Sequence, residues 1–327
     1  MAAAGHSVVE ISPPSRRWQK YPVVWAAIGQ MFHEAEASVR CFINRKQFDA
    51  FICHAPCGVA FGKGLTVFHL NTPQYIRANY SKRNPNYWKL RIVNQSSDRL
   101  SSYGKHRNIA VSHHQAEWLR GIGIRVDKVV YHPVNTRLFC PADNKEKAKN
   151  LIGLSPERIT AISVGRFDKV KRFDRIIRLA RRFPQIDFML VGPRRSDFSY
   201  LPSNCYSYGP IEEGILPDYY RASDLFIQTP SSEAFSLVLA EALSCGLPFL
   251  STRTGLAADL PSFNSLFDLA LLDGDEKNDD AFLSRLVASS QLRIELASIG
   301  RKFAVEQLSS EVAGETYRNL IQNCLSG

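Results

Sequence analysis

Short apolar runs alternate with longer amphipathic segments along most of this chain, and that alternation limits the folds it can adopt. The first series of candidate strands is Ser7–Ile11, Phe48–Cys53, Leu65–His69, Ile109–Ser112 and Lys128–Tyr131. The second series is Ile159–Val164, Ile186–Val191, Cys205–Tyr208, Asp224–Gln228 and Pro248–Ser251. Helical patterns, for example Phe173–Phe183 and Gln291–Val305, fill most of the gaps. The alternation predicts an α/β fold, with helices on both faces of parallel sheets.

The length of the chain indicates two domains, because 327 residues exceed what one hydrophobic core usually holds. The polar stretch PADNKEKAKN, residues 141–150, separates the two series of strands and follows Pro133. We therefore predict two doubly wound, Rossmann-like domains facing a cleft, residues 1–145 and 146–305. A C-terminal helix at 306–327 could cross back to the first domain. Ligands of such sheets bind at the carboxyl ends of the strands.

The start of the first domain departs from this pattern. The stretch GHSVVEIS resembles the second strand of a doubly wound sheet, preceded by the tail of a helix. The usual first strand, with its glycine-rich turn, is not found before it. Because that strand is central, its loss would leave neighbouring strand edges unpaired. Either the gene start is misplaced, or this sheet closes in another way.

Charge is distributed unevenly between the two halves. Residues 1–150 contain 22 Lys and Arg against 9 Asp and Glu, a net charge of +13. The remainder contains 19 against 22, a net charge of −3. A basic N-terminal half predicts an anionic partner, which could be nucleic acid, a membrane surface or a small substrate.

Composition argues against several other classes of protein. No apolar run reaches the roughly 18 residues that span a bilayer, and the N-terminus lacks the pattern of a secretory signal. The seven cysteines are scattered, which fits reduced thiols in the cytoplasm. Cys53 and Cys57 flank His54, but no second ligand pair has zinc-like spacing. Buried thiols are therefore the preferred interpretation over a metal site.

A basic loop leaves the first strand of the second series. In ISVGRFDKVKRFDRIIRLA the strand ends at Val164, and Gly165 permits a tight turn. The cations that follow are Arg166, Lys169, Lys171 and Arg172. Cations at a strand end suit a phosphate or diphosphate, Arg through bidentate contacts and Lys as a mobile point charge. A solvated basic loop is the alternative.

Two acids bracket an apolar segment further along. In SSEAFSLVLAEALSCGLPFL, residues 231–250, a helix is predicted from about Ser236 to Cys245. Glu233 lies just before this helix and Glu241 inside it. The amides around Ala234–Leu237 lack helical partners and suit an anion, while carboxylates accept hydrogen bonds from hydroxyls. The combination indicates a nucleotide sugar. A helix with one capping acid and one surface acid is the alternative.

These motifs resemble those of retaining glycosyltransferases of family four, among the glycosyl transferases group 1, which have the two-domain B-type fold. The resemblance rests on GRFDKVK, on the two glutamates eight positions apart and on EALSCGLPFLST. It extends from Gly5 to roughly Val305 and is strongest over Ile162–Gly255. It implies that residues 1–145 bind an acceptor and that residues 146–305 bind the nucleotide-sugar donor.

The resemblance also implies roles for single residues. Arg166 and Lys171, beside Gly165, would grip the donor diphosphate. Glu233 would hold hydroxyls of the donor sugar, and Glu241 those of the ribose. Backbone amides between the two acids would contact sugar and phosphate; these belong to Ala234, Phe235, Ser236 and Leu237.

Further implied positions lie elsewhere in the chain. Loops at 192–194 and 209–211 resemble those that surround the base, which adds Arg194 and Ile211 to the donor site. LTVFHLNTPQYI resembles the family's strand followed by a histidine, so His69 is expected to contact the donor sugar or the acceptor. A satisfied polar residue at a strand end is the alternative. The predicted catalytic set is His69, Arg166, Lys171 and Glu233.

The chain departs from the family at two points. Glu233-Ala234-Phe235-Ser236 stands where Glu-Gly-Phe-Gly is usual, which reduces backbone freedom. Val170 stands where an acid usually precedes the lysine. Neither change removes a charged contact.

Aromatic and basic residues interleave in RRWQKYPVVW and in QYIRANYSKRNPNYWKLR. They are Arg16, Arg17, Trp18, Lys20, Arg77, Lys82, Arg83, Trp88 and Lys89. Family members that glycosylate lipid-linked acceptors dock this domain on anionic membranes, which the resemblance implies here. A solvated face over core aromatics is the alternative. Nucleic acid is not expected, because no RNA-binding motif accompanies these residues.

The implied reaction moves a sugar from a nucleoside diphosphate to an acceptor hydroxyl with retained anomeric configuration. The expected setting is polysaccharide, glycolipid or lipopolysaccharide synthesis, in the cytoplasm or at the inner face of a membrane. The resemblance implies no metal and no other cofactor. Two alternatives stay open: a nucleotide-sugar epimerase of the same fold, and a non-catalytic partner subunit, suggested by the missing strand.

Overall fold

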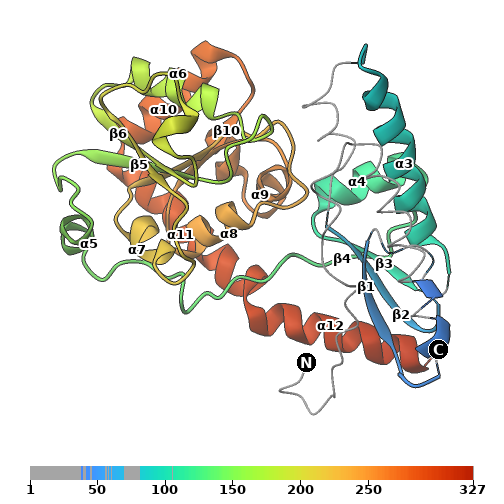
Figure 1. Cartoon of the computed structure of the whole chain (residues 1–327). Helices are drawn as coiled ribbons and strands as arrows, with labels where there is room; N and C mark the ends of the chain where they lie inside the picture. The colour runs from blue at the N-terminus through green and yellow to red at the C-terminus, as the bar shows by residue number, and fades with distance from the viewer. Residues whose placement is uncertain are drawn as a thin grey trace. The chain divides into compact units, whose positions relative to one another are not determined.

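The computed structural model describes residues 38–39, 42–44, 46–55, 57, 59, 61–69, 82–104 and 106–326. The chain divides into two compact units, each with its own parallel sheet (Figure 1). Unit 1 comprises Met1–Tyr131 and Ala313–Gly327, and unit 2 comprises His132–Val312. The expected strand Ser7–Ile11 lies outside the described residues. In the described ranges no helix has the length and hydropathy required to cross a bilayer.

Unit 1 contains a sheet of four parallel strands in the order β1-β2-β3-β4. The strands are β1 (Phe51–Ala55), β2 (Gly64–Phe68), β3 (Arg107–Ala110) and β4 (Lys128–Val129). The helices are α3 (Pro85–Ser102), α4 (His113–Gly121) and most of α12 (Ser310–Ser326). β1 begins at Phe51, which pairs with Gly64, rather than at the predicted Phe48; the Phe48 ring packs edge-on against Phe51 ahead of the ladder.

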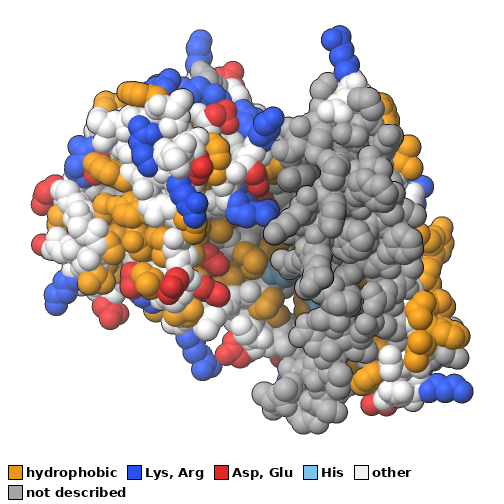
Figure 2. Space-filling model, viewed as in Figure 1, with side chains coloured by type: hydrophobic (Ala, Val, Ile, Leu, Met, Phe, Trp, Pro, Cys, Tyr) orange, Lys and Arg blue, Asp and Glu red, His pale blue; other side chains and the backbone are white. Residues whose placement is uncertain are grey.

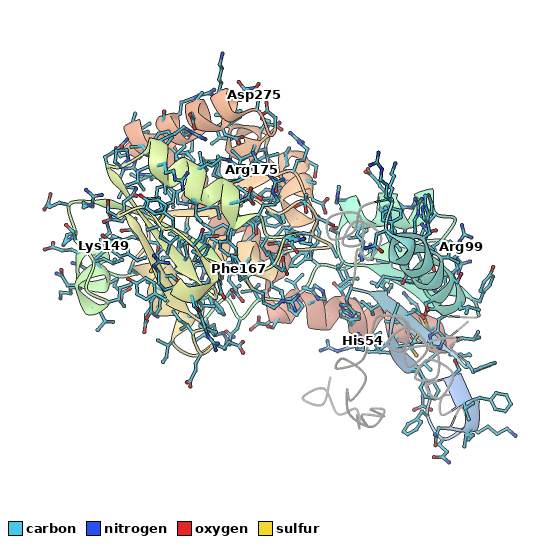
Figure 3. The ribbon with its side chains drawn as sticks, turned by 45° about the horizontal axis from the view of Figure 1, so that its top comes forward. His54, Arg99, Lys149, Phe167, Arg175 and Asp275 are labelled. Atoms are coloured by element: carbon cyan, nitrogen blue, oxygen red, sulfur yellow. The ribbon has the colours of Figure 1, made fainter. Side chains whose placement is uncertain are left out.

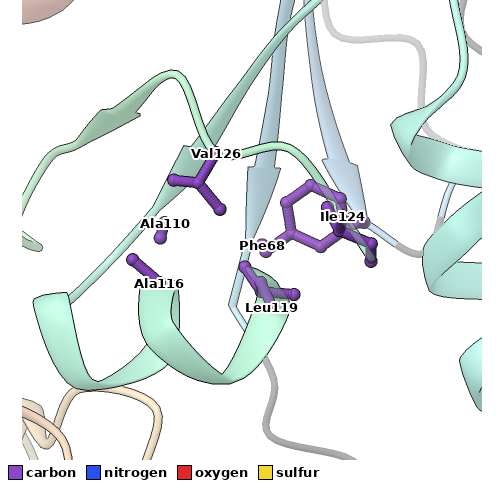
Figure 4. Close-up of a cluster of buried hydrophobic side chains, with 7 residues drawn as sticks. Phe68, Ala110, Ala116, Leu119, Ile124 and Val126 are labelled. Atoms are coloured by element: carbon purple, nitrogen blue, oxygen red, sulfur yellow. The ribbon is translucent and has the colours of Figure 1, made fainter. Parts of the chain in front are cut away.

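The core of unit 1 lies between its sheet and α4 (Figure 4). Phe68 and Ala110, at the ends of β2 and β3, meet Leu119 of α4, and each side chain is at most 2% exposed. The small side chain of Ala110 faces Ala116, which lets the helix approach the sheet closely. Burial of each large side chain contributes about 1.5–3 kcal/mol. This packing fixes the carboxyl ends of β2 and β3.

Unit 2 contains a sheet of six parallel strands in the order β10-β9-β8-β5-β6-β7. The strands are β5 (Ile159–Val164), β6 (Ile186–Val191), β7 (Cys205–Gly209), β8 (Leu225–Gln228), β9 (Phe249–Thr252) and β10 (Leu271–Leu272). From β5 the chain proceeds outward through β6 and β7, then returns to place β8 on the other side of β5. Ligands of doubly wound sheets bind at the carboxyl ends of the strands at such a reversal.

Helices connect these strands. They are α5 (Lys145–Leu151), α6 (Phe173–Arg182), α7 (Leu216–Arg221), α8 (Leu237–Ser244), α9 (Leu256–Phe263), α10 (Glu276–Ala288) and α11 (Ser290–Leu308), with short 3-10 turns η3 (Arg195–Asp197) and η4 (Ser265–Ala270). The predicted two-unit α/β fold is confirmed. The predicted strands at Ile159–Val164 and Ile186–Val191 coincide with β5 and β6, and α8 begins one residue after the predicted Ser236.

A buried ion pair ties α5 to the amino ends of β5 and β8. The ammonium of Lys149 lies 2.6 Å from Oδ2 of Asp224, and the two side chains are 3% and 19% exposed. Figure 3 labels Lys149 on its helix. The same Asp224 oxygen accepts the backbone N–H of Thr160 at 2.9 Å. Two elements of unit 2 therefore depend on one carboxylate.

We expect Asp224→Ala to lower the free energy of unfolding by about 3–5 kcal/mol, because it leaves the Lys149 ammonium buried without its counter-charge. Asp218→Ala is the control, since the Asp218–Arg221 pair is 38% and 25% exposed and such a pair contributes about 0–1 kcal/mol. Urea unfolding of both variants measures the difference. Equal losses would contradict this account of the pair.

Candidate active site

The loop between β5 and α6 is held by its own side chains. Oδ1 of Asp168 accepts the backbone N–H of Lys171 at 2.9 Å. The Phe167 ring packs 6.4 Å from Phe173 and 5.0 Å from Phe198, between ring centroids (Figure 3). The Arg166 side chain is 89% exposed, and its guanidinium lies 4.0 Å from the Asp168 carboxylate. The loop thus fixes the backbone at Lys171 and leaves the Arg166 cation in solvent.

Lys171 and Glu233 form an ion pair between two motifs that are far apart in the sequence. The ammonium lies 2.6 Å from Oε1 of Glu233, and the two side chains are 21% and 16% exposed. The pair joins the loop after β5 to the loop after β8, which are neighbouring strands. An incoming anion would compete with Glu233 for the Lys171 ammonium. The Glu233 carboxylate would then be able to accept hydrogen bonds from hydroxyl groups.

The helix α8 begins at Leu237, four residues after Glu233. Ser236 is the N-cap residue, and no side chain caps the helix. The first helical bond runs from the N–H of Ala240 to the carbonyl of Ser236 at 3.3 Å, so the amides of the first turn, which begins at Leu237, have no partner within the helix. Ala234 and Phe235 are buried, while Leu237 is 48% exposed. The arrangement supplies backbone donors and a partial positive charge beside the ion pair.

Glu241 lies on the second turn of the same helix and is largely buried. The hydroxyl of Tyr220, from α7, donates to its Oε2 at 2.8 Å. Burial raises the pKa of Glu241 to about 7; the Tyr220 hydrogen bond opposes this rise, and the charge of Glu213 adds to it. Tyr220 was not predicted from the sequence, because no fixed spacing relates a residue of α7 to one of α8.

The two loops predicted to surround a base are joined to each other. The N–H of Gly192 donates to the carbonyl of Gly209 at 2.7 Å, and that of Gly209 donates to Pro193 at 2.9 Å. Gly192 has φ 109°, and a Cβ there would lie 2.0 Å from the carbonyl oxygen of Gly165. Only glycine fits so close to the loop after β5.

The side chains expected in this base region are more exposed. Arg194 is exposed, and its backbone N–H donates to Oδ2 of Asp197 at 2.7 Å. Ile211 is half-buried. Gly165, Gly192 and Gly209 therefore meet at one end of the sheet, whereas Arg194 and Ile211 border that end from the loops after β6 and β7.

His69, in unit 1, directly follows β2 and lies against a second histidine. Nε2 of His69 is 2.5 Å from Nδ1 of His54, near the end of β1, and the ring centroids are 4.8 Å apart. Partial burial lowers the pKa of His54. In the sequence, His54 drew attention only through its flanking cysteines. The parallel pairing of β1 with β2 was the signal that could have brought the two histidines together.

No metal centre is apparent in the ranges that the structure describes, where no three His, Cys, Asp or Glu side chains lie close enough to hold an ion. Asp273 and Asp275 have Asp-x-Asp spacing, although no such pair was expected in this sequence. Both carboxylates accept hydrogen bonds at the start of α10. Asp275 caps the helix by accepting the backbone N–H of Lys277, and Asp273 accepts the backbone N–H of Asp275 and the side-chain amide of Asn278.

Comparison with known proteins finds a family that part of the chain resembles. Residues 144–262, which include the ion pair and α8, match the family model described as glycosyl transferases group 1. This part of unit 2 is therefore similar to the glycosyl transferases group 1 family. The match falls within unit 2 and contains the residues predicted to bind a donor, except His69 in unit 1.

Curated proteins that are similar to this chain are named as glycosyltransferases. D-inositol 3-phosphate glycosyltransferase of Mycobacterium sp. (strain KMS) is 29% identical over 180 residues, which are 49% of this chain and 40% of that protein. The lipopolysaccharide core mannosyltransferase LpsB of Rhizobium meliloti is 27% identical over 220 residues, 59% of this chain and 61% of its own. The matches therefore span about two to three fifths of these relatives.

Solved structures show that the chain has the B-type glycosyltransferase fold. Sucrose-phosphate synthase from Thermosynechococcus elongatus superimposes with a TM-score of 0.69 at 19% identity, covering 90% of this chain and 78% of its own. Anabaena HepE, solved with UDP-glucose, gives a TM-score of 0.62 at 18% identity, covering 80% and 72%. The names of the curated relatives and of the synthase do not favour the epimerase alternative.

The raised pKa of Glu241 predicts a pH-dependent cost to stability. An acid whose pKa is higher in the folded than in the unfolded state destabilises the fold once the unfolded form ionises, so stability falls from about pH 4.5 to about pH 7. We expect Glu241→Gln to raise the melting temperature relative to the wild type more at pH 8 than at pH 5. Thermal unfolding at both values measures this; a gain that does not change with pH would contradict it.

Proposed function

We propose that this chain transfers a sugar from a nucleoside-diphosphate sugar to an acceptor hydroxyl, with retention of the anomeric configuration. The observation that carries the proposal is the Lys171–Glu233 ion pair at the N-terminus of α8, with Glu241 one turn further along the helix. A cation and helix amides suit a diphosphate, and the two carboxylates suit the hydroxyls of the sugar and the ribose.

The proposed chemistry requires stabilisation of the departing diphosphate. Lys171, Arg166 and the positive end of α8 would supply it, because fixed donors and cations stabilise charge that develops on a leaving group. Glu233 would hold the donor sugar once the Lys171 ammonium has moved from Glu233 to the diphosphate. Gly165, Arg194 and Ile211 would border the nucleoside, and His69 would contact the donor sugar or the acceptor. No metal and no other cofactor takes part in this scheme, and we assign no nucleophile.

Two further expectations concern the setting of the reaction. The named relatives include a lipopolysaccharide core mannosyltransferase and a galactosylglucosyldiacylglycerol synthase, which supports a saccharide or lipid-linked acceptor. The surface of α3 supports peripheral contact with an anionic membrane on the cytoplasmic side. Trp88 and Ile92, one turn apart, are 49% and 62% exposed, and the Arg91 guanidinium lies 5.6 Å from the Trp88 ring.

Other features of this surface fit an interfacial helix. Hydrophobic side chains gather along the margin of unit 1 where α3 lies (Figure 2). Lys82 and Arg83, just before the helix, are exposed. Exposed aromatic and aliphatic groups among cations favour the boundary between water and anionic headgroups. The other predicted contacts, Arg16, Arg17, Trp18, Lys20 and Arg77, and the side chain of Lys89, lie outside the described structure.

A thermal-shift panel of UDP, GDP, ADP and their sugars tests donor binding. We expect one nucleotide series to raise the melting temperature, because a ligand selective for the folded state stabilises it. Arg166→Ala should reduce that shift without changing the melting temperature of the free protein, since its side chain is 89% exposed. Lys277→Ala, an exposed cation on α10, should leave the shift unchanged.

Absence of any shift, or equal shifts for both variants, would contradict the donor site. Incubation with the bound nucleotide sugar then separates the remaining activities. Transfer that requires an added acceptor supports the proposal, product from the donor alone identifies an epimerase, and binding without turnover identifies a non-catalytic subunit.

Membrane contact is tested by sedimentation with phosphatidylglycerol vesicles and phosphatidylcholine vesicles. We expect binding to the anionic vesicles only, and weaker binding at high salt. Ile92→Ser should reduce it. Ile294→Ser on α11 is the matched control, because Ile294 is also 62% exposed. Equal binding by the two variants would contradict a role for α3.

A further inference from the structure

Two residues at the predicted donor site have an unusual backbone conformation. Among the described residues, Arg172 and Ser236 are the non-glycine residues with positive φ, at 54° and 92°. Arg172 is the N-cap of α6 and Ser236 the N-cap of α8, and neither helix has a side-chain cap. Residues other than glycine keep such a conformation only where the surrounding structure holds it.

Consecutive residues at the end of β8 hold both positions. The hydroxyl of Thr229 donates to the carbonyl of Arg172 at 2.8 Å. The hydroxyl of Ser236 donates to the side-chain oxygen of Gln228 at 2.8 Å. Gln228 and Thr229 are 4% and 1% exposed. Neighbouring side chains of an extended segment point to opposite faces, so one residue reaches the loop after β8 and the other the loop after β5.

The Gln228 amide is itself fixed by the adjacent strand. Its Nε2 donates to Oγ of Ser251 at 2.9 Å, and Ser251 is the residue of β9 paired with Gln228 in the sheet. The Ser251 hydroxyl donates in turn to the carbonyl of Thr252 at 2.9 Å. Each hydroxyl proton in this buried chain therefore has an acceptor, which orients the Gln228 oxygen toward Ser236.

We propose that Gln228 and Thr229, here termed the β8 clamp, are positioning residues for donor binding. The clamp holds the N-terminus of α8 and the backbone that follows Lys171 at a fixed separation, so that the Lys171 cation and the helix amides meet the same diphosphate. Neither clamp residue touches the donor. This inference rests on the proposed function and extends it to residues that no motif includes.

The first test needs no ligand. In hydrogen exchange of the free protein, we expect Thr229→Val to speed exchange at Lys171–Arg175 and Gln228→Met to speed it at Leu237–Leu239, with the rest of unit 2 unchanged. Thr160→Val is the matched control: its buried hydroxyl, on β5, has no hydrogen-bond partner. Unchanged exchange at these loops, or faster exchange throughout unit 2, would overturn the proposal.

The second test measures affinity for whichever of UDP, GDP and ADP binds the wild type most tightly. We expect Thr229→Val and Gln228→Met each to weaken binding roughly tenfold, and Thr229→Ser to restore it, because one well-placed hydrogen bond is lost and regained. Ser236→Gly removes the need for the Gln228 contact, since glycine adopts positive φ freely. Gln228→Met should therefore lose less affinity in the Ser236→Gly background.

The two tests separate the two proposals. An equal loss of affinity in both backgrounds, with no rescue by Thr229→Ser, would overturn the clamp while leaving the donor site intact. If none of the three nucleotides binds the wild type, the proposed function fails, and hydrogen exchange alone decides whether the clamp positions the loops.

Discussion

The 2.6 Å ion pair between Lys171 and Glu233 is the contact on which the candidate site depends. The ion pair forms because the chain passes from β5 through β6 and β7 and then returns, which places β8 beside β5. That reversal brings two loops 62 residues apart to one end of the sheet. The pair also places an acid beside the positive end of α8. A phosphate bound there would therefore meet a carboxylate as well as hydrogen-bond donors.

Close backbone contacts support that ion pair. Gly255 has φ 53°, and a Cβ there would lie 2.5 Å from the carbonyl oxygen of Phe235 and 3.0 Å from Cβ of Glu233. The next amide, of Leu256, donates to the same Phe235 oxygen at 2.7 Å. The loop after β9 thus braces the loop that carries Glu233. Burial of Glu241, whose pKa rises to about 7, is a stability cost of the kind that functional sites often retain.

Much of unit 2 could be predicted from the sequence, because its strands are short runs rich in apolar residues and α8 ends shortly before Gly246 and Pro248. The loops were identified from charge and from family motifs. Side-chain partners were not predictable. The order of the strands brings Tyr220 to Glu241 and Gln228 to Ser251, and local periodicity carries no information about that order. In unit 1 the strand pairing that joins His54 to His69 was missed for the same reason, and the predicted strand at Ser7–Ile11 lies outside the described residues.

A crystal structure of the chain with its tightest-binding nucleoside diphosphate would test the central claim most directly. The account predicts the diphosphate at the first turn of α8, with the Lys171 ammonium moved from Glu233 to a phosphate oxygen and the Glu241 carboxylate on the ribose hydroxyls. A nucleotide bound elsewhere, with the Lys171–Glu233 pair intact, would contradict it.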